Sequence, residues 1–258
     1  MNESTGTTTW DFLSLFSNRN FEEKFAIVVL NRRLKLPISF YSKLWSNSIY
    51  KTAADGGANR LYELVTASPS SEFNLDSVIG DLDSLHSEAR KYWEDKGALI
   101  IHDPGQDSTD LTKAIEYIRR QTSQESLDIV VLGDIGGRVD HGLSVLNNLH
   151  IQQKPFYTSG KLYLLSNESI TFILQSGNHT LTNFEFFDGV NLGKHVGIIP
   201  FKEPSIISTY GLEWDVRDWK TKIGGQVSTS NHVKSTSVSI QTSKDVIFTI
   251  ELKIISKP

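Results

Sequence analysis

Residues 127–149 read LDIVVLGDIGGRVDHGLSVLNNL and contain, in order, an apolar run, a glycine-rich turn and a helical pattern. The run at residues 127–132 is short and rich in β-branched residues, which is typical of a buried strand. Leucines then recur at positions 143, 146 and 149, a spacing that places them on one face of a helix. The stretch predicts a strand, a polar loop and a helix, the repeating unit of a parallel α/β sheet.

Four earlier apolar runs extend this pattern toward the N-terminus: residues 24–30 (KFAIVVL), 49–54 (IYKTAA), 75–79 (LDSVI) and 98–102 (ALIIH). Amphipathic helical patterns lie between them, as at residues 87–96 and 111–118. The alternation predicts an α/β domain over residues 1–168 on a parallel sheet. Its first part, residues 1–20, is rich in Thr, Ser and Asn, and we expect a loosely ordered arm there.

The pattern changes after about residue 169. Helical spacing ends, and short alternating runs such as residues 170–174 (ITFIL) and 246–250 (VIFTI) are separated by Gly, Ser, Thr and Asn. Turn signals at such short intervals are typical of antiparallel sheets. Residues 169–258 are therefore predicted to form a second, all-β domain of the sandwich type.

Composition narrows the class of protein further. The chain of 258 residues has 26 basic and 30 acidic residues, a formal charge of −4, which does not favour a general nucleic-acid or anionic-membrane binder. It has no cysteine, which excludes disulfides, thiolate metal ligands and a cysteine nucleophile. The first residues lack a signal-peptide pattern, and no apolar run approaches the ~20 residues of a membrane span. We expect a soluble, cytoplasmic protein with neither a nucleic-acid nor a membrane partner.

Aspartates follow the carboxyl ends of the predicted strands, which form the ligand-binding edge of parallel α/β sheets. They are Asp55, Asp81, Asp83, Asp103, Asp107, Asp110, Asp134 and Asp140. Carboxylates gathered at one edge repel one another unless a positive charge lies among them, and Mg²⁺ takes oxygen ligands that it shares with phosphates. Asp81 and Asp83 lie two apart in an extended segment and point to the same side, which favours a Mg²⁺ site. Helix N-capping is the alternative for Asp83, for Asp110 or Thr109, and for Asp140.

Glycines interrupt the same loops, at positions 56, 57, 133, 136 and 137. Followed by Arg138, whose guanidinium matches phosphate oxygens, they indicate a phosphate cradle, although tight strand-to-helix turns are the alternative. The sequence has no GxxxxGK[ST] and no GxGxxG that opens a helix, so neither a P-loop kinase nor a dinucleotide oxidoreductase is supported.

In the second predicted domain, Trp214 could stack on an aromatic or cationic ring, and Ser230 and Asn231 could hydrogen-bond a heterocycle. A buried sandwich tryptophan and a polar turn are the plainer alternative.

Six segments, in this order, carry a resemblance: 54–60 (ADGGANR), 80–84 (GDLDS), 106–110 (QDSTD), 136–141 (GGRVDH), 211–214 (GLEW) and 228–231 (STSN). Together they resemble the eukaryotic type of thiamine pyrophosphokinase; no single segment decides, but the combination is specific. The resemblance implies an α/β nucleotide-binding domain followed by a β-sandwich, a homodimer, and transfer of pyrophosphate from ATP to thiamine with Mg²⁺ and release of AMP.

The resemblance also implies roles for matching residues. The implied Mg²⁺ ligands are Asp81, Asp83 and Asp110. The implied ATP- and phosphate-binding residues are Asp55, Gly56, Gly57, Asn59, Arg60, Thr109, Gly136, Gly137 and Arg138. The implied thiamine-binding residues are Gln106, Trp214, Ser228, Ser230 and Asn231, in a pocket completed across the dimer. The chain departs from the family at Gly105, where an aspartate is usual, and at Leu82, where an aromatic residue is common.

The reaction so implied is attack by the thiamine hydroxyl on the β-phosphorus of ATP. Its catalytic residues would be Asp81 through the metal, Arg138 on the transferred group, and Asp107 or Asp140 as proton acceptor, a choice that stays open. Two other hypotheses remain. One is a Mg²⁺-dependent phosphohydrolase or nucleotidyltransferase on a similar sheet. The other is a carbohydrate- or protein-binding module, which would explain the second domain alone.

Overall fold

The computed structural model describes residues 6–12, 25–69, 72–122, 126–184 and 190–254. Two compact units make up the chain: Phe21–Asn167, and Met1–Asn20 together with Glu168–Pro258. Within the described ranges, no helix combines the length and the apolar character that a membrane crossing requires.

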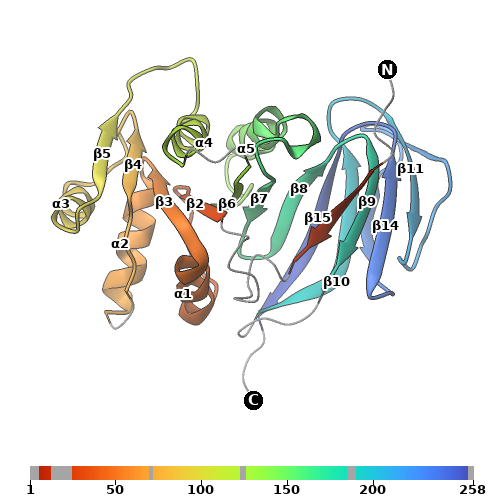
Figure 1. The fold of residues 1–258 in the computed structure, drawn as a ribbon, viewed down its shortest axis with the longest axis horizontal. Helices are drawn as coiled ribbons and strands as arrows, with labels where there is room; N and C mark the ends of the chain where they lie inside the picture. The colour runs from red at the N-terminus through yellow and green to blue at the C-terminus, as the bar shows by residue number, and fades with distance from the viewer. Residues whose placement is uncertain (1–5, 13–24, 70–71, 123–125, 185–189, 255–258) are drawn as a thin grey trace. The chain divides into compact units, whose positions relative to one another are not determined.

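The unit Phe21–Asn167 contains a parallel six-stranded sheet with helices on both faces (Figure 1). In order across the sheet, its strands are β7 (Leu162–Leu165), β6 (Asp128–Leu132), β2 (Phe25–Val29), β3 (Ser48–Ala54), β4 (Ser77–Gly80) and β5 (Leu99–His102). One face carries α1 (Ile38–Asn47), α2 (Gly57–Ala67) and α3 (Ser87–Asp95). The other carries α4 (Asp110–Gln121) and α5 (Val139–Gln152), and a 3-10 turn follows at Pro155–Tyr157.

The apolar runs form strands because helices cover both faces of this sheet. Every residue of β2 and the last four residues of β6 are buried, as a continuous apolar run predicts for a central parallel strand. The chain runs outward from β2 to β5 and then returns to β6 on the other side of β2. The loops that follow β2 and β6 therefore leave the sheet at its topological switch point, where such folds bind ligands. The α/β architecture predicted from the sequence is confirmed.

The C-terminal unit is built from two sheets. One has the order β13 (Ser228–His232), β10 (Val190–Pro200), β15 (Val246–Ile254) and β8 (Ser169–Leu174), all antiparallel. The other has the order β1 (Thr7–Asp11), β9 (Gly177–Thr182), β14 (Ser237–Thr242), β11 (Ser205–Tyr210) and β12 (Trp219–Thr221). Trp10 of the second sheet stacks on Phe172 of the first with ring centroids 4.2 Å apart. The prediction that this half is built of strands is confirmed.

The structure differs from the expected N-terminal arm at residues 6–12. Thr7–Asp11 form strand β1, which pairs in parallel with β9, a strand of the C-terminal unit. Trp10 is fully buried, and its Nε1 donates a hydrogen bond of 3.2 Å to Nδ1 of His179. The β-branched threonines suit a strand, but their polar composition indicated a loop, because the anchoring partner lies 169 residues away in the chain. The other residues of the expected arm lie outside the described residues.

Candidate active site

Three aspartates from separate elements lie together at the carboxyl edge of the α/β sheet. Asp55 follows β3, Asp81 follows β4, and Asp110 is the first residue of α4. One carboxylate oxygen from each lies within 4.8 Å of those from the other two. Because β3 and β4 are paired in parallel, their ends bring the first two carboxylates side by side. We call Asp55, Asp81 and Asp110 the acid cluster.

Gly80 permits this close approach. It is the last residue of β4, and a Cβ atom there would lie 2.8 Å from Cβ of Asp55 and 2.9 Å from Oδ1 of Asp110. A larger residue would therefore push the carboxylates apart. Asp55 itself has a left-handed backbone, φ 44°, a conformation that aspartate tolerates better than most residues.

The electrostatics of the acid cluster differ from residue to residue. Burial raises the pKa of Asp55, which is 5% exposed. Its Oδ2 accepts a hydrogen bond of 3.2 Å from the backbone N–H of Ser84, whereas its buried Oδ1 has no hydrogen-bond partner in the part of the chain that the structure describes. Burial, and then the negative charge of Asp81, raise the pKa of Asp110. The backbone N–H of Asp83 donates to Asp81 at 3.3 Å and lowers the pKa of Asp81.

Two predicted residues near the acid cluster make other contacts. Asp83 is exposed, and its Oδ1 accepts a 2.9 Å hydrogen bond from the hydroxyl of Ser84. Asp55, and not Asp83, lies with Asp81 and Asp110. Asn59 is buried and bonds the backbone of the loop after β4 at Ser84 and His86. Its amide therefore holds the loop that carries Asp81.

The loop between β5 and α4 reaches the same edge. Nε2 of Gln106 donates to Oδ2 of Asp81 at 3.4 Å. Thr109 is the N-cap of α4 and accepts a 3.2 Å hydrogen bond from the N–H of Thr112. Of the two residues that fitted a cap here, Thr109 is the one that takes this role, and the carboxylate of Asp110 remains in the acid cluster.

The loop between β6 and α5 is more open. Gly137 has φ 81°, which favours glycine. Nη2 of Arg138 lies 2.6 Å from Oδ2 of Asp140, and the two side chains are 71% and 63% exposed. Asp140 therefore pairs with Arg138, and the N-cap residue of α5 makes no side-chain cap.

In the C-terminal unit, Trp214 is 56% exposed, so the alternative of a buried sandwich tryptophan is wrong. Asn231 is buried and fixes the backbone of Trp214. Its Oδ1 accepts a hydrogen bond of 3.1 Å from the backbone N–H of Trp214, and its Nδ2 donates one of 2.9 Å to the backbone carbonyl of Trp214. The ring of His232 lies 5.0 Å from that of Trp214 and bonds the carboxylate of Glu213. Ser230 is exposed with φ 55°, and Ser228 begins β13.

Comparison with known proteins gives this geometry a context. Residues 41–158 match the family model for the thiamin pyrophosphokinase catalytic domain, and residues 178–247 match the model for its vitamin B1 binding domain. Thiamine pyrophosphokinase 3 of Oryza sativa is 34% identical over 246 residues, 89% of this chain and 87% of that protein. Thiamine pyrophosphokinase 1 of Arabidopsis thaliana is 34% identical over 249 residues, with shares of 89% and 87%. The chain belongs to the thiamine pyrophosphokinase family.

The structural comparison agrees with this assignment. Thiamin pyrophosphokinase from Candida albicans superposes with a TM-score of 0.82 at 25% identity, over 98% of this chain and 95% of that one. The predicted family and the predicted function are confirmed: members of the thiamine pyrophosphokinase family are enzymes that transfer pyrophosphate from ATP to thiamine and form thiamine diphosphate.

Sequence reasoning missed two basic residues that form ion pairs with aspartates at the carboxyl edge of the sheet. Arg32, just beyond β2, has its Nε 3.5 Å from Oδ1 of Asp134, the two residues lying after the neighbouring strands β2 and β6. The segment after β2 lacks the Asp and Gly residues that mark the other loops, so its sequence does not indicate that Arg32 lies near an aspartate of the sheet edge. Lys113 lies in the middle of an apolar helical pattern. Its Nζ lies 3.5 Å from Oδ1 of Asp110, and the only sequence signal for this contact is the three-residue spacing of the two residues on a helix.

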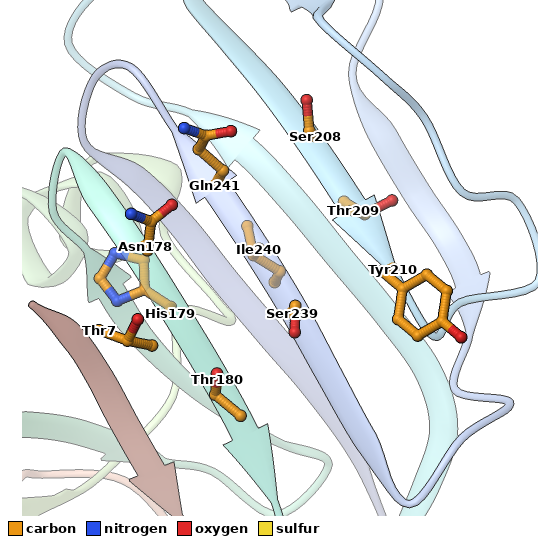
Figure 2. Close-up of a pocket in the computed structure, with 10 residues that line it drawn as sticks. All are labelled: Thr7, Asn178, His179, Thr180, Ser208, Thr209, Tyr210, Ser239, Ile240 and Gln241. Atoms are coloured by element: carbon orange, nitrogen blue, oxygen red, sulfur yellow. The ribbon is translucent and has the colours of Figure 1, made fainter. Parts of the chain in front are cut away.

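A hollow of about 330 Å³ lies elsewhere, on the five-stranded sheet of the C-terminal unit (Figure 2). Its lining includes Asn178, Thr180, Ser208, Ser239 and Gln241 from β9, β11 and β14. Among the described residues that line the hollow there is one histidine, His179, but no Asp, Glu, Lys or Arg, so the hollow provides neither carboxylates for a cation nor permanent cations for a triphosphate. The hollow does not share the chemistry of the acid cluster.

Proposed function

We propose that the acid cluster is where this chain transfers pyrophosphate from ATP to the hydroxyl of thiamine, giving thiamine diphosphate and AMP. The convergence of Asp55, Asp81 and Asp110 to within 4.8 Å carries the proposal. It supports a nucleotide site because the cluster lies at the carboxyl edge of a parallel sheet, the edge from which the glycine-containing loop with Arg138 also leaves.

The acid cluster fits Mg²⁺. Three carboxylates at this separation repel one another, and the buried Oδ1 of Asp55 has no partner among the described residues, two features that a divalent cation would resolve. Asp55, Asp81 and Asp110 would hold it, and Asp83 stays a predicted ligand. When bound, the cation neutralises part of the triphosphate charge that must approach this acidic edge.

The chain's own residues would position and deprotonate the substrates. The pair of Arg138 with Asp140 is exposed and therefore weak, so a phosphate group can replace Asp140 on the guanidinium. Arg138 would then face the transferred group, and Asp140 would be free to accept the proton of the thiamine hydroxyl. Asp107 is the other candidate base, since it is exposed and outside the acid cluster. Gln106 would orient thiamine beside Asp81.

The thiamine side of the pocket would come from the C-terminal unit of a second copy, in a homodimer. Trp214 offers an exposed aromatic face on which the cationic thiazolium can stack, and Asn231 fixes that residue. In the α/β unit, Ile135, Val139 and Leu143 are each more than half exposed around Arg138. Exposed apolar side chains beside a polar site are typical of a surface covered by a partner.

One incubation tests the proposal. With ATP, Mg²⁺ and thiamine, we expect AMP and thiamine diphosphate in equal amounts, and neither product when thiamine is omitted or EDTA is added. Thiamine-independent release of inorganic phosphate would indicate a phosphohydrolase instead. An adenylated thiamine would indicate a nucleotidyltransferase.

A further inference from the structure

A lysine ammonium is buried beside the acid cluster. The side chain of Lys113 in α4 is 4% exposed. Its Nζ lies 3.5 Å from Oδ1 of Asp110 and donates a hydrogen bond of 2.8 Å to the backbone carbonyl of Asp103. Lysine is almost never buried to this extent unless it is paired, because its ammonium loses hydration. The proposed reaction gives Lys113 no role, so its burial calls for an explanation.

We infer that Lys113 is a positioning residue of the pyrophosphate transfer: it ties the loop after β5 to the acid cluster and limits the cluster to one resident divalent cation. The inference rests on the proposed function, since it concerns the same cluster.

The first part of the role follows from the backbone contacts of Asp103. Its N–H donates to the carbonyl of Gly80 at 2.8 Å, and its carbonyl accepts from Lys113. Asp103 thus joins the end of β4 to α4 through the lysine. The loop that begins at Asp103 carries Gln106, which reaches Asp81 at 3.4 Å. Removal of the ammonium would free this loop from α4 and misplace a substrate-facing side chain.

The second part follows from charge. When ionised, the three carboxylates of the acid cluster carry three negative charges, and the ammonium of Lys113 reduces their sum to two. One divalent cation then neutralises the four groups, and a second would leave two uncompensated positive charges in a half-buried site.

The test uses Lys113→Met, which keeps the unbranched shape without the terminal ammonium, and Lys113→Gln, which is smaller and packs without overlap. Lys91→Met is the matched control, because Lys91 is an exposed lysine on α3. Mn²⁺ binding is titrated by electron paramagnetic resonance in the absence of nucleotide and thiamine. Steady-state formation of AMP with Mg²⁺ and thermal unfolding are measured on the same preparations.

We expect wild type to bind one Mn²⁺. Without the repelling ammonium, the Lys113 variants should bind the first Mn²⁺ about three- to tenfold more tightly and accept a second. Their kcat should fall roughly tenfold to a hundredfold with the thiamine KM nearly unchanged, because a displaced loop impairs positioning. The control should match wild type in all three measurements.

Three outcomes for the Lys113 variants would overturn the inference and leave Lys113 a structural residue. They are Mn²⁺ binding that weakens in proportion to lost thermal stability, an unchanged kcat, and loss of the fold in both variants. Failure of the proposed function is a different result. In that case wild type itself would form no AMP with thiamine, whatever the variants bind.

Discussion

Two parts of the same sheet edge differ in how far they are assembled before any ligand binds. The acid cluster is held by two paired strands and a helix end, with Asp55 buried and Gly80 making room. The loop after β6 ends in Arg138 and Asp140, both mostly exposed and paired with each other. The proposed cation-binding half is therefore preorganised by the fold, whereas the proposed phosphate-binding half is satisfied internally and would have to exchange partners when a ligand binds.

We expect the largest loss of activity from a substitution in the acid cluster. Asp81→Asn is expected to lower kcat by about a thousandfold or more, because the metal loses a ligand, with thermal unfolding nearly unchanged. AMP formation and a calorimetric melt measure both. Asp83→Asn is the matched comparison, and it should weaken nucleotide-free Mn²⁺ binding less than Asp81→Asn does, because Asp83 lies outside the acid cluster. Equal loss of Mn²⁺ binding in the two variants would add Asp83 to the cluster.

A substitution in the exposed loop after β6 should lower the activity less. Arg138→Ala is expected to lower kcat roughly a hundredfold, because one donor set on the transferred group is lost, with little change in stability for so exposed a side chain. Nucleotide-free Mn²⁺ binding should stay at the wild-type level, which separates the two halves. A loss of Mn²⁺ binding would show that the arginine loop and the acid cluster are one unit.

Outside this edge, Trp214→Ala should raise the thiamine KM roughly two- to thirtyfold, the range expected for a lost cation–π contact, with kcat nearly unchanged. Ile223→Ala removes another exposed apolar side chain of the same unit and serves as the control. A selective rise in the ATP KM would move Trp214 to the nucleotide side.

The smallest expected effect concerns stability and pH. An aspartate whose pKa is raised in the folded state binds its proton more tightly there, so folding loses stability as the pH rises from the unfolded value of about 3.9 through the folded one. Asp55 and Asp110 have raised pKa values, so in EDTA the melting temperature should fall over this window, by a few degrees. Asp55→Asn should reduce the fall, and Mg²⁺ should offset it. A melting temperature that rises across the window in wild type would contradict the burial argument.

Local pattern accounts for most of the elements in the α/β unit. The helix expected at residues 87–96 is α3, Ser87–Asp95, and the run at residues 127–132 contains β6. Strand β7, Leu162–Leu165, and strand β1 were not predicted. Each is short, and its strand state depends on a neighbour distant in the chain, β6 in one case and β9 in the other.

The sequence by itself determined the family, the alternation of strands and helices, and the placement of aspartates, glycines and Arg138 after strand ends, because these depend on residue order and local periodicity. Only the tertiary structure decided which carboxylates meet. Asp55, Asp81 and Asp110 are brought together by the pairing of β3 with β4 and by α4, whereas Asp83 is not part of this group and accepts a hydrogen bond from Ser84. The position of Lys113 likewise follows only from the tertiary structure. Its burial and its hydrogen bond to Asp103 depend on packing and not on spacing along the chain.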